Sequence, residues 1–236
     1  MIFHCIYKQG DERSEVYLQE ALESAKKFNI PVQPYPGIYS NINNIIKNEQ
    51  LFINPLGKYK IKHNGVLGCF LSHYFLWHKC LRKRIPIGIL EYDAIFRKPL
   101  PNFVTTKFSH YLHLDYNRHI YLDHPDYDYL TEVEKDHRPF SIEELKEKKE
   151  KAKLTRPFKY INNNNIRGAF GYIIKPSGAR LLIEATKKYG ILPADIQPNL
   201  LYCKIHYSVP SIVMLNPTSL FERTKYSHTT NDRTFD

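Results

Sequence analysis

The sequence lacks several features that would place it in a specialised class of protein. Its four cysteines form no C-x-x-C pair, which argues against a zinc ribbon or a thioredoxin-type redox motif. The long uncharged run at residues 65–78 is too short to cross a bilayer, which takes about 20 apolar residues. Glycine and proline number only 10 and 15 of 236 residues, so the chain is neither collagen-like nor a linker. The first residues, M-I-F-H-C-I-Y-K, do not resemble a signal peptide, so we expect the protein to stay where it is made, with reduced thiols.

The composition is otherwise that of a folded protein with a basic surface. Aromatic residues make up 14% and apolar residues 42% of the chain, which excludes disorder along its whole length. A chain of 236 residues can form a single α/β domain. The formal net charge of +10 favours an anionic partner, such as nucleic acid, lipid head groups or a phosphorylated small molecule.

Hydrophobic periodicity predicts an α/β fold with a mostly parallel central sheet. Residues 2–7 read as a strand, and a helix follows from a cap at Ser14 to about residue 29. A second strand begins at residue 30, and strand–helix–strand is the opening unit of a parallel sheet. Residues 39–62 read as irregular. Residues 65–84 form the next helix, and the apolar run I-P-I-G-I-L that follows it reads as a buried strand.

The second half of the chain is less regular. Residues 169–174 predict a strand and residues 176–189 a helix. The lysine-rich residues 141–159 are either a solvated segment or a basic arm over a polyanionic acceptor. No internal repeat is visible. We therefore predict one domain over residues 1–236, with an irregular insert at about 101–160 and a polar tail at about 216–236.

Two acidic residues, Glu91 and Asp93, follow the apolar run directly. Side chains two apart in a strand share a face, so both carboxylates are expected to point the same way. Ligand sites in open α/β sheets lie at the carboxyl ends of strands, and carboxylates there can hold a hard divalent cation beside a substrate phosphate. The alternative is an incidental pair of acids in a loop.

Other candidate residues lie in a glycine-containing helix start and in a later loop. The run G-V-L-G-C-F-L-S-H at residues 65–73 allows close approach of a ligand or a neighbouring strand. His73 and His78 are five apart and do not share a helical face, so they are not a two-histidine metal site. Asp195, in the sequence P-A-D, is a candidate general base.

In chain order the motifs are G-x-L-G-C-x-L-S-H, I-L-E-x-D-A about twenty residues later, G-x-x-G-Y-I-I-x-P-x-x-A, and P-x-D. This series resembles glycosyltransferase family 25, the lipopolysaccharide-biosynthesis type, over most of residues 65–195. The resemblance implies a GT-A-like nucleotide-sugar-binding domain. It also implies a UDP-sugar donor, a divalent metal (Mn²⁺ or Mg²⁺) and transfer with inversion at the sugar carbon.

The resemblance also assigns roles by position. Glu91 and Asp93 match the metal and diphosphate motif, and Asp195 matches the acid expected to be the catalytic base. The block expected to shape the donor pocket contributes Gly65, Gly68, Ser72 and His73, and the acceptor side contributes Gly168 and Tyr172.

The chain departs from the family pattern in two places. The family usually reads Glu-Asp-Asp, whereas this chain has Tyr92 in the middle, which puts metal affinity in question if that acid is required. The usual Arg-rich turn after the first strand is replaced by residues 7–13, so nucleotide-base contacts there are expected to differ.

The C-terminal tail is a further candidate for contact with the donor. Its basic side chains, including Arg223 and His228, can fold over a diphosphate; a frayed terminus is the alternative.

Three acceptors or partners fit these features. The resemblance favours a cell-surface oligosaccharide built in the cytoplasm, with peripheral contact between the basic surface and the inner face of a membrane. The second is viral DNA carrying 5-hydroxymethylcytosine in a host cytoplasm, where basic residues contact phosphates and tyrosines such as Tyr111 and Tyr116 line a pocket for the flipped base. The third is a non-catalytic nucleic-acid-binding protein, which the acidic pair disfavours.

Overall fold

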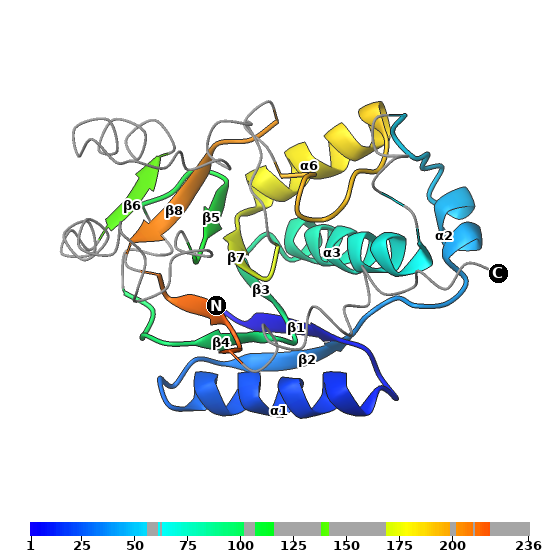
Figure 1. The fold of residues 1–236 in the computed structure, drawn as a ribbon. Helices are drawn as coiled ribbons and strands as arrows, with labels where there is room; N and C mark the ends of the chain where they lie inside the picture. Colours follow the sequence, from blue (N-terminus) through cyan, green and yellow to red (C-terminus); the bar gives the residue numbers. More distant parts are fainter. Residues whose placement is uncertain are drawn as a thin grey trace, which may run out of the picture.

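The computed structural model describes residues 1–55, 61, 63–101, 107–115, 138–141, 169–198, 202–209 and 211–217. Its elements follow one another along the chain as shown in Figure 1. In order they are β1 (Phe3–Tyr7), α1 (Glu12–Lys26), β2 (Val32–Pro36), α2 (Ile42–Asn48), α3 (Asn64–Lys83), β3 (Ile87–Glu91), β4 (Ala94–Phe96), β5 (Tyr111–His113), β6 (Arg138–Ser141), β7 (Gly171–Ile174), α6 (Pro176–Tyr189), β8 (Ile205–Val209) and β9 (Val213–Leu215).

A seven-stranded sheet in the order β2-β1-β3-β7-β5-β8-β6 forms the centre of the molecule. Strand β1 pairs in parallel with β2 and β3, and β5 pairs in parallel with β8. Strands β7 and β6 run antiparallel to their neighbours. Five of the seven strands therefore share one direction, which confirms the predicted α/β class, although the sheet is mixed rather than wholly parallel.

Helices cover both faces of the sheet (Figure 1). On one face, Ile87, Ile89 and Tyr172 pack in a core with residues of α3 and α6. On the other face, Leu90 and Ile173 pack with α1 and the two-stranded sheet β4–β9. Because neighbouring residues of a strand point to opposite faces, each central strand contributes to both cores. Apolar residues on both faces explain why I-G-I-L reads as a continuous apolar run.

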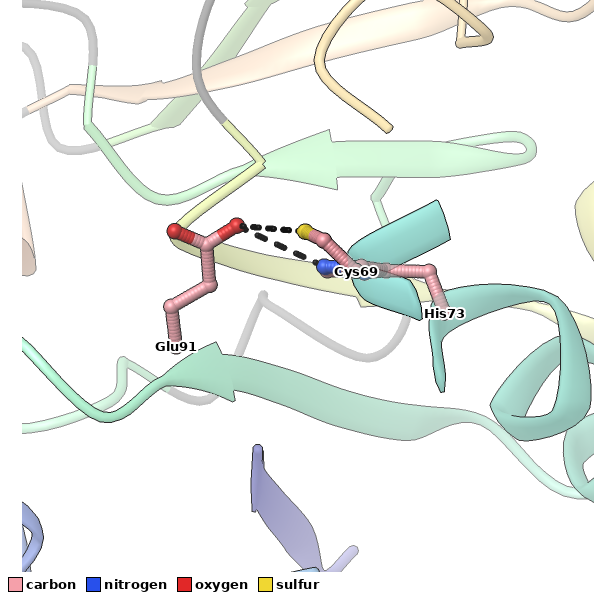
Figure 2. A group of neighbouring side chains, drawn as sticks. All are labelled: Cys69, His73 and Glu91. Carbon is pink, nitrogen blue, oxygen red and sulfur yellow. Dashed lines mark hydrogen bonds and ion pairs between the residues drawn. The ribbon is translucent and has the colours of Figure 1, made fainter. Parts of the chain in front are cut away.

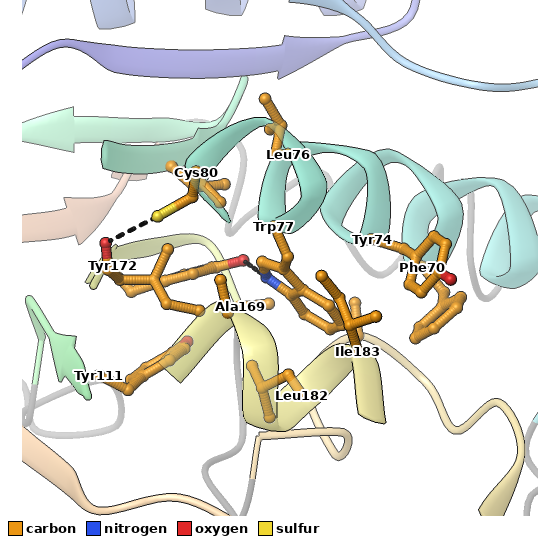
Figure 3. Close-up of a cluster of buried hydrophobic side chains, with 14 of the residues drawn as sticks. Phe70, Tyr74, Leu76, Trp77, Cys80, Tyr111, Ala169, Tyr172, Leu182 and Ile183 are labelled. Atoms are coloured by element: carbon orange, nitrogen blue, oxygen red, sulfur yellow. Dashed lines mark hydrogen bonds between the residues drawn. The ribbon is translucent and has the colours of Figure 1, made fainter. Parts of the chain in front are cut away.

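Helix α3 is the main element on the first face. Its aromatic side chains Phe70, Tyr74 and Trp77 are fully buried against each other and against α6 (Figure 3). A Cβ on Gly68 would lie 2.1 Å from the carbonyl oxygen of Ile38, so only glycine lets the helix approach the chain between β2 and α2 this closely. The predicted helix over residues 65–84 is thus confirmed to within one residue at each end.

The structure corrects three local predictions. Helix α1 is capped by Asp11, whose carboxylate accepts a hydrogen bond from the Ser14 amide at 2.9 Å, so the helix begins before the predicted cap. Residues 39–62 contain a helix, α2, although their asparagine-rich sequence predicts irregular structure. Ile42, the first residue of this helix, is buried. The segment expected to be an irregular insert contributes β5 and β6 to the main sheet.

Within the described residues, no helix has the length and apolar character needed to span a membrane. The lysine-rich segment after Ser141 and the tail beyond Pro217 lie outside the described residues.

Candidate functional site

Three side chains from α3 and β3 meet at the carboxyl end of β3 (Figure 2). Cys69 and His73 are four residues apart on α3 and therefore share one face of the helix. Glu91 is the last residue of β3. Its Oε1 atom lies 3.8 Å from Cys69 Sγ and 3.5 Å from His73 Nε2. The ligand-type atoms of all three residues lie within 4.8 Å of one another, and we call this group the Cys–His–Glu cluster.

The other ring nitrogen of His73, which does not face Glu91, contacts a second group of residues. This nitrogen, Nδ1, lies 2.8 Å from the Tyr172 hydroxyl. Trp77 Nε1 donates to the same hydroxyl at 2.9 Å, as Figure 3 shows. Because an indole N–H can only donate, the phenol accepts from Trp77 and retains its own proton for a further bond. When the phenol donates to Nδ1, the neutral imidazole carries its proton on Nε2, which faces the Glu91 carboxylate.

Aromatic stacking with two neighbouring rings holds Tyr172 in place. The ring stacks on His73 at a centroid distance of 5.7 Å and on Tyr111 at 4.4 Å. Burial raises the pKa of both tyrosines well above the ordinary value, so both remain neutral phenols. Tyr111 is therefore part of the core and cannot line a pocket for a flipped base. Tyr116 lies outside the described residues.

The electrostatic environment of Cys69 brings a fourth residue to the site. Burial raises the pKa of the Cys69 thiol well above its usual value, and the negative charges of Glu91 and Asp195 raise it further. Cys69 is thus a neutral thiol in the metal-free protein, and Asp195 lies close enough to act on it. The loop that carries Asp195 is held by the amides of Ile196 and Gln197, both of which donate to the Pro193 carbonyl.

Asp93 is placed differently from Glu91. Strand β3 ends at Glu91, and Tyr92 and Asp93 form the turn before β4, so the alternation of a strand does not extend to Asp93. The Asp93 side chain is buried, whereas that of Glu91 is half-buried. The Asp93 carbonyl accepts a hydrogen bond from the Asn216 amide at 2.7 Å, which ties the turn to the end of β9. The Tyr92 ring packs at a tilt against Tyr17 of α1.

Two residues expected in the donor pocket have a structural role. The Ser72 hydroxyl accepts from the Ile38 amide at 2.9 Å and donates to the Gly68 carbonyl at 2.7 Å. Gly68 and Ser72 therefore hold the loop between β2 and α2 against α3. This loop presents Tyr39, whose pKa is raised by burial and by the nearby Cys69, Tyr92 and Glu91. Gly65 is the second residue of α3.

The remaining expected residues are placed only in part. Tyr172 reaches the Cys–His–Glu cluster through His73, whereas Gly168, Arg223 and His228 lie outside the described residues. Sequence reasoning missed Cys69 and Trp77 as members of the site. Their spacing of four residues on either side of His73 was the available signal, because it places all three on one helical face.

Of the comparisons with known proteins, the family match agrees with the motif-based resemblance. The sequence profile of glycosyltransferase family 25 (LPS biosynthesis protein) matches residues 8–197. No curated protein matches the chain. Among solved structures, mouse xyloside xylosyltransferase 1 in its apo form is similar at 9% sequence identity, with a TM-score of 0.31, over 84% of this chain and 79% of that chain. At that score the likeness supports no argument.

Proposed function

The chain belongs to glycosyltransferase family 25 and is therefore a glycosyltransferase that uses a sugar donor, and we propose that the donor is a UDP-sugar bound at the carboxyl end of β3. The observation that carries the proposal is that the family match over residues 8–197 contains the whole site, from α1 to the Asp195 loop. Carboxyl ends of strands are the usual ligand edge of an open α/β sheet. The domain is proposed to be a single GT-A-like unit over residues 1–236.

The proposed reaction is an inverting transfer. A hydroxyl oxygen of the acceptor attacks the anomeric carbon of the sugar, the bond from that carbon to the UDP oxygen breaks, and Asp195 takes the hydroxyl proton. A half-buried carboxylate in a well-held loop suits a general base, because it keeps a fixed position near the acceptor. The family description favours an oligosaccharide of the lipopolysaccharide type as acceptor.

Glu91 and Asp93 are the residues proposed to hold a divalent metal. Glu91 fits this role, because its carboxylate is partly exposed at the end of β3. Asp93 fits less directly, since it is buried in the following turn. A bound Mn²⁺ or Mg²⁺ ion would supply positive charge that offsets the charge developing on the departing UDP. Tyr92 lies between them, so this turn has no third acid.

One observation favours a second candidate acceptor, DNA carrying 5-hydroxymethylcytosine. Exposed cations lie at the C-terminal end of each of two helices: Arg82 and Lys83 in the last turn of α3 with Arg84 at its C-cap, and Lys187 and Lys188 in the last turn of α6. Such side chains can bind DNA phosphates without reading sequence, and they can also contact an anionic membrane face. We place the oligosaccharide first because it follows from the family.

The test is release of UDP from a panel of UDP-sugars with Mn²⁺ or Mg²⁺, with and without DNA containing 5-hydroxymethylcytosine. We expect metal-dependent release that Glu91→Gln abolishes and that Glu23→Gln, a change at an exposed residue of α1, leaves intact. Release that requires the modified DNA, and that falls steeply with salt, would replace the oligosaccharide by DNA as acceptor. Failure to release UDP from any donor would overturn the proposed donor.

A further inference from the structure

The Cys–His–Glu cluster gathers a sulfur, a nitrogen and an oxygen atom at one point (Figure 2). These atoms come from a helix and from the end of a strand, so the fold itself brings them together. We propose that Cys69, His73 and Glu91 form a binding site for a zinc-type transition-metal ion, with three protein ligands and a fourth position open.

The distances within the cluster fit tetrahedral coordination. Zinc binds sulfur at about 2.3 Å, imidazole nitrogen at about 2.05 Å and carboxylate oxygen at about 2.1 Å, so the edges of its tetrahedron are about 3.6 Å from sulfur to oxygen and about 3.4 Å from nitrogen to oxygen. The corresponding distances to Glu91 Oε1 are 3.8 Å from Cys69 Sγ and 3.5 Å from His73 Nε2. The remaining pair lies within 4.8 Å, so a side-chain shift of about 1 Å completes the geometry.

The ligand types select the metal. A thiolate together with an imidazole favours zinc over magnesium or manganese, which prefer oxygen ligands. The site therefore differs in chemistry from the Glu91–Asp93 pair, although it shares Glu91 with it. Binding replaces the thiol proton of Cys69, which is released to solvent, and changes no oxidation state.

The residues behind His73 have the arrangement of an outer ligand shell. A metal-bound histidine is usually held through its other ring nitrogen. Here that nitrogen is Nδ1, which faces the Tyr172 hydroxyl at 2.8 Å. With a metal on Nε2, the imidazole proton lies on Nδ1, the tautomer opposite to the one in which the phenol donates. A hydroxyl oxygen has two lone pairs, so it can then accept from both Trp77 Nε1–H and His73 Nδ1–H. That arrangement leaves the Nε2 lone pair directed at the cluster.

Exposure within the cluster places the open position. The His73 side chain is fully buried, whereas the Glu91 side chain is 24% exposed and Cys69 is half-buried. Three protein ligands with one accessible position are typical of zinc sites that bind a water molecule or a substrate oxygen. The metal ion would lie at the carboxyl end of β3, the edge where ligands of open α/β sheets bind, and its positive charge would attract an anionic ligand there. The inference goes beyond the proposed transfer reaction and does not rest on it.

The experiment is a titration of the full chain, stripped of metal by a chelator, with Co²⁺ as a spectroscopic substitute for zinc. We expect one equivalent to bind, with a thiolate-to-cobalt charge-transfer band in the near ultraviolet and strong visible bands of tetrahedral cobalt. One equivalent of Zn²⁺ should remove both. Absence of the charge-transfer band in the wild-type protein overturns the proposal without any variant.

Variants then assign the ligands. Cys69→Ala should abolish the charge-transfer band, and the matched Cys80→Ala should keep it, because Cys80 is a buried thiol of the same helix that donates to backbone carbonyls outside the cluster. Tyr172→Phe should lower cobalt affinity about 10- to 100-fold, as loss of an outer-shell partner does, and Tyr111→Phe should leave it unchanged. A band that persists in Cys69→Ala would overturn the assignment.

The outcome is separable from that of the proposed function. UDP release that depends on Mn²⁺, in a protein that shows no cobalt–thiolate band, would refute the zinc-type site and leave the transferase proposal standing. A cobalt–thiolate band in a protein that releases no UDP would do the reverse.

Discussion

Tyr172→Phe removes one oxygen atom from the centre of the molecule and tests whether the hydroxyl holds the site together. Two buried nitrogen atoms, Trp77 Nε1 and His73 Nδ1, lose their hydrogen bond to the Tyr172 hydroxyl, while the ring keeps its stacking on Tyr111. Each buried polar atom left without a partner costs about 1–3 kcal/mol, so we expect a loss of about 3 kcal/mol in the free energy of unfolding. For a chain of this length that corresponds to a fall in Tm of about 6–12 °C.

Tyr111→Phe is the matched control. Both tyrosines are fully buried, and their rings are stacked, but the described residues provide no hydrogen-bond partner for the Tyr111 hydroxyl. Removing it should change the free energy of unfolding by less than about 1 kcal/mol. Urea unfolding of both variants is the assay, with an expected difference between midpoints of about 1 M for a slope near 3 kcal/mol/M. Midpoints that agree within about 0.2 M would refute the reasoning.

Three further predictions concern other parts of the structure. Gly68→Ala drives a Cβ to 2.1 Å from the Ile38 carbonyl oxygen, so we expect a loss of about 3 kcal/mol in urea unfolding, because backbone rather than a side chain must move. Asp195→Asn should lower the transfer rate at least about 100-fold while calorimetry shows unchanged donor binding; a normal rate would move the base elsewhere. Burial and the charges of Lys79 and Lys83 lower the pKa of His4 to about 4. Between pH 6.5 and 4, His4 is therefore protonated in the unfolded chain but not in the folded chain. Stability should fall across that window, and His4→Gln should flatten the fall in urea midpoints measured at pH 7 and pH 4.5.

Elements with a strong apolar period could be predicted from the sequence. Helices α3 and α6 and strand β3 fall close to their predicted bounds, because the spacing of their large apolar residues indicates which side chains are buried. Helix α2 could not be predicted, because its asparagines favour turns and it is held as a helix by tertiary packing, with Ile42 buried in the main core and Ile45 and Ile46 packed against it. Strand β5 has three residues, too few for a period, and takes its place through pairing with β7 and β8.

The site could be predicted in its location but not in its membership. The end of β3 was identified because an acid follows a buried run, and the helix block was identified by its motif. The meeting of Glu91 with Cys69 and His73 depends on how α3 packs across the sheet, and no local pattern specifies that packing. Tyr172 joins the site from 99 residues beyond His73. The expectation that Asp93 shares a face with Glu91 assumed that the strand continues, whereas a turn begins at Tyr92.

The departure at Tyr92 and the composition of the cluster bear on the same question, the charge at the end of β3. The family pattern that the chain resembles places three acids there, and this chain has two, of which one is buried in the turn. Tyr92 in the middle position offers no carboxylate, which leaves Glu91 as the partly exposed carboxylate of the motif. Binding a hard cation through one accessible carboxylate is weak, since such ions take several oxygen ligands. A thiol and an imidazole next to Glu91 supply ligands of another kind, so the loss of one acid shifts the preference of this edge from manganese or magnesium toward zinc.

Tyr92→Asp should therefore strengthen binding of Mn²⁺ without strengthening binding of Co²⁺ at Cys69, and titration calorimetry with the two ions decides it. Equal gains for both ions would mean that one shared site, rather than two ligand sets meeting at Glu91, binds them.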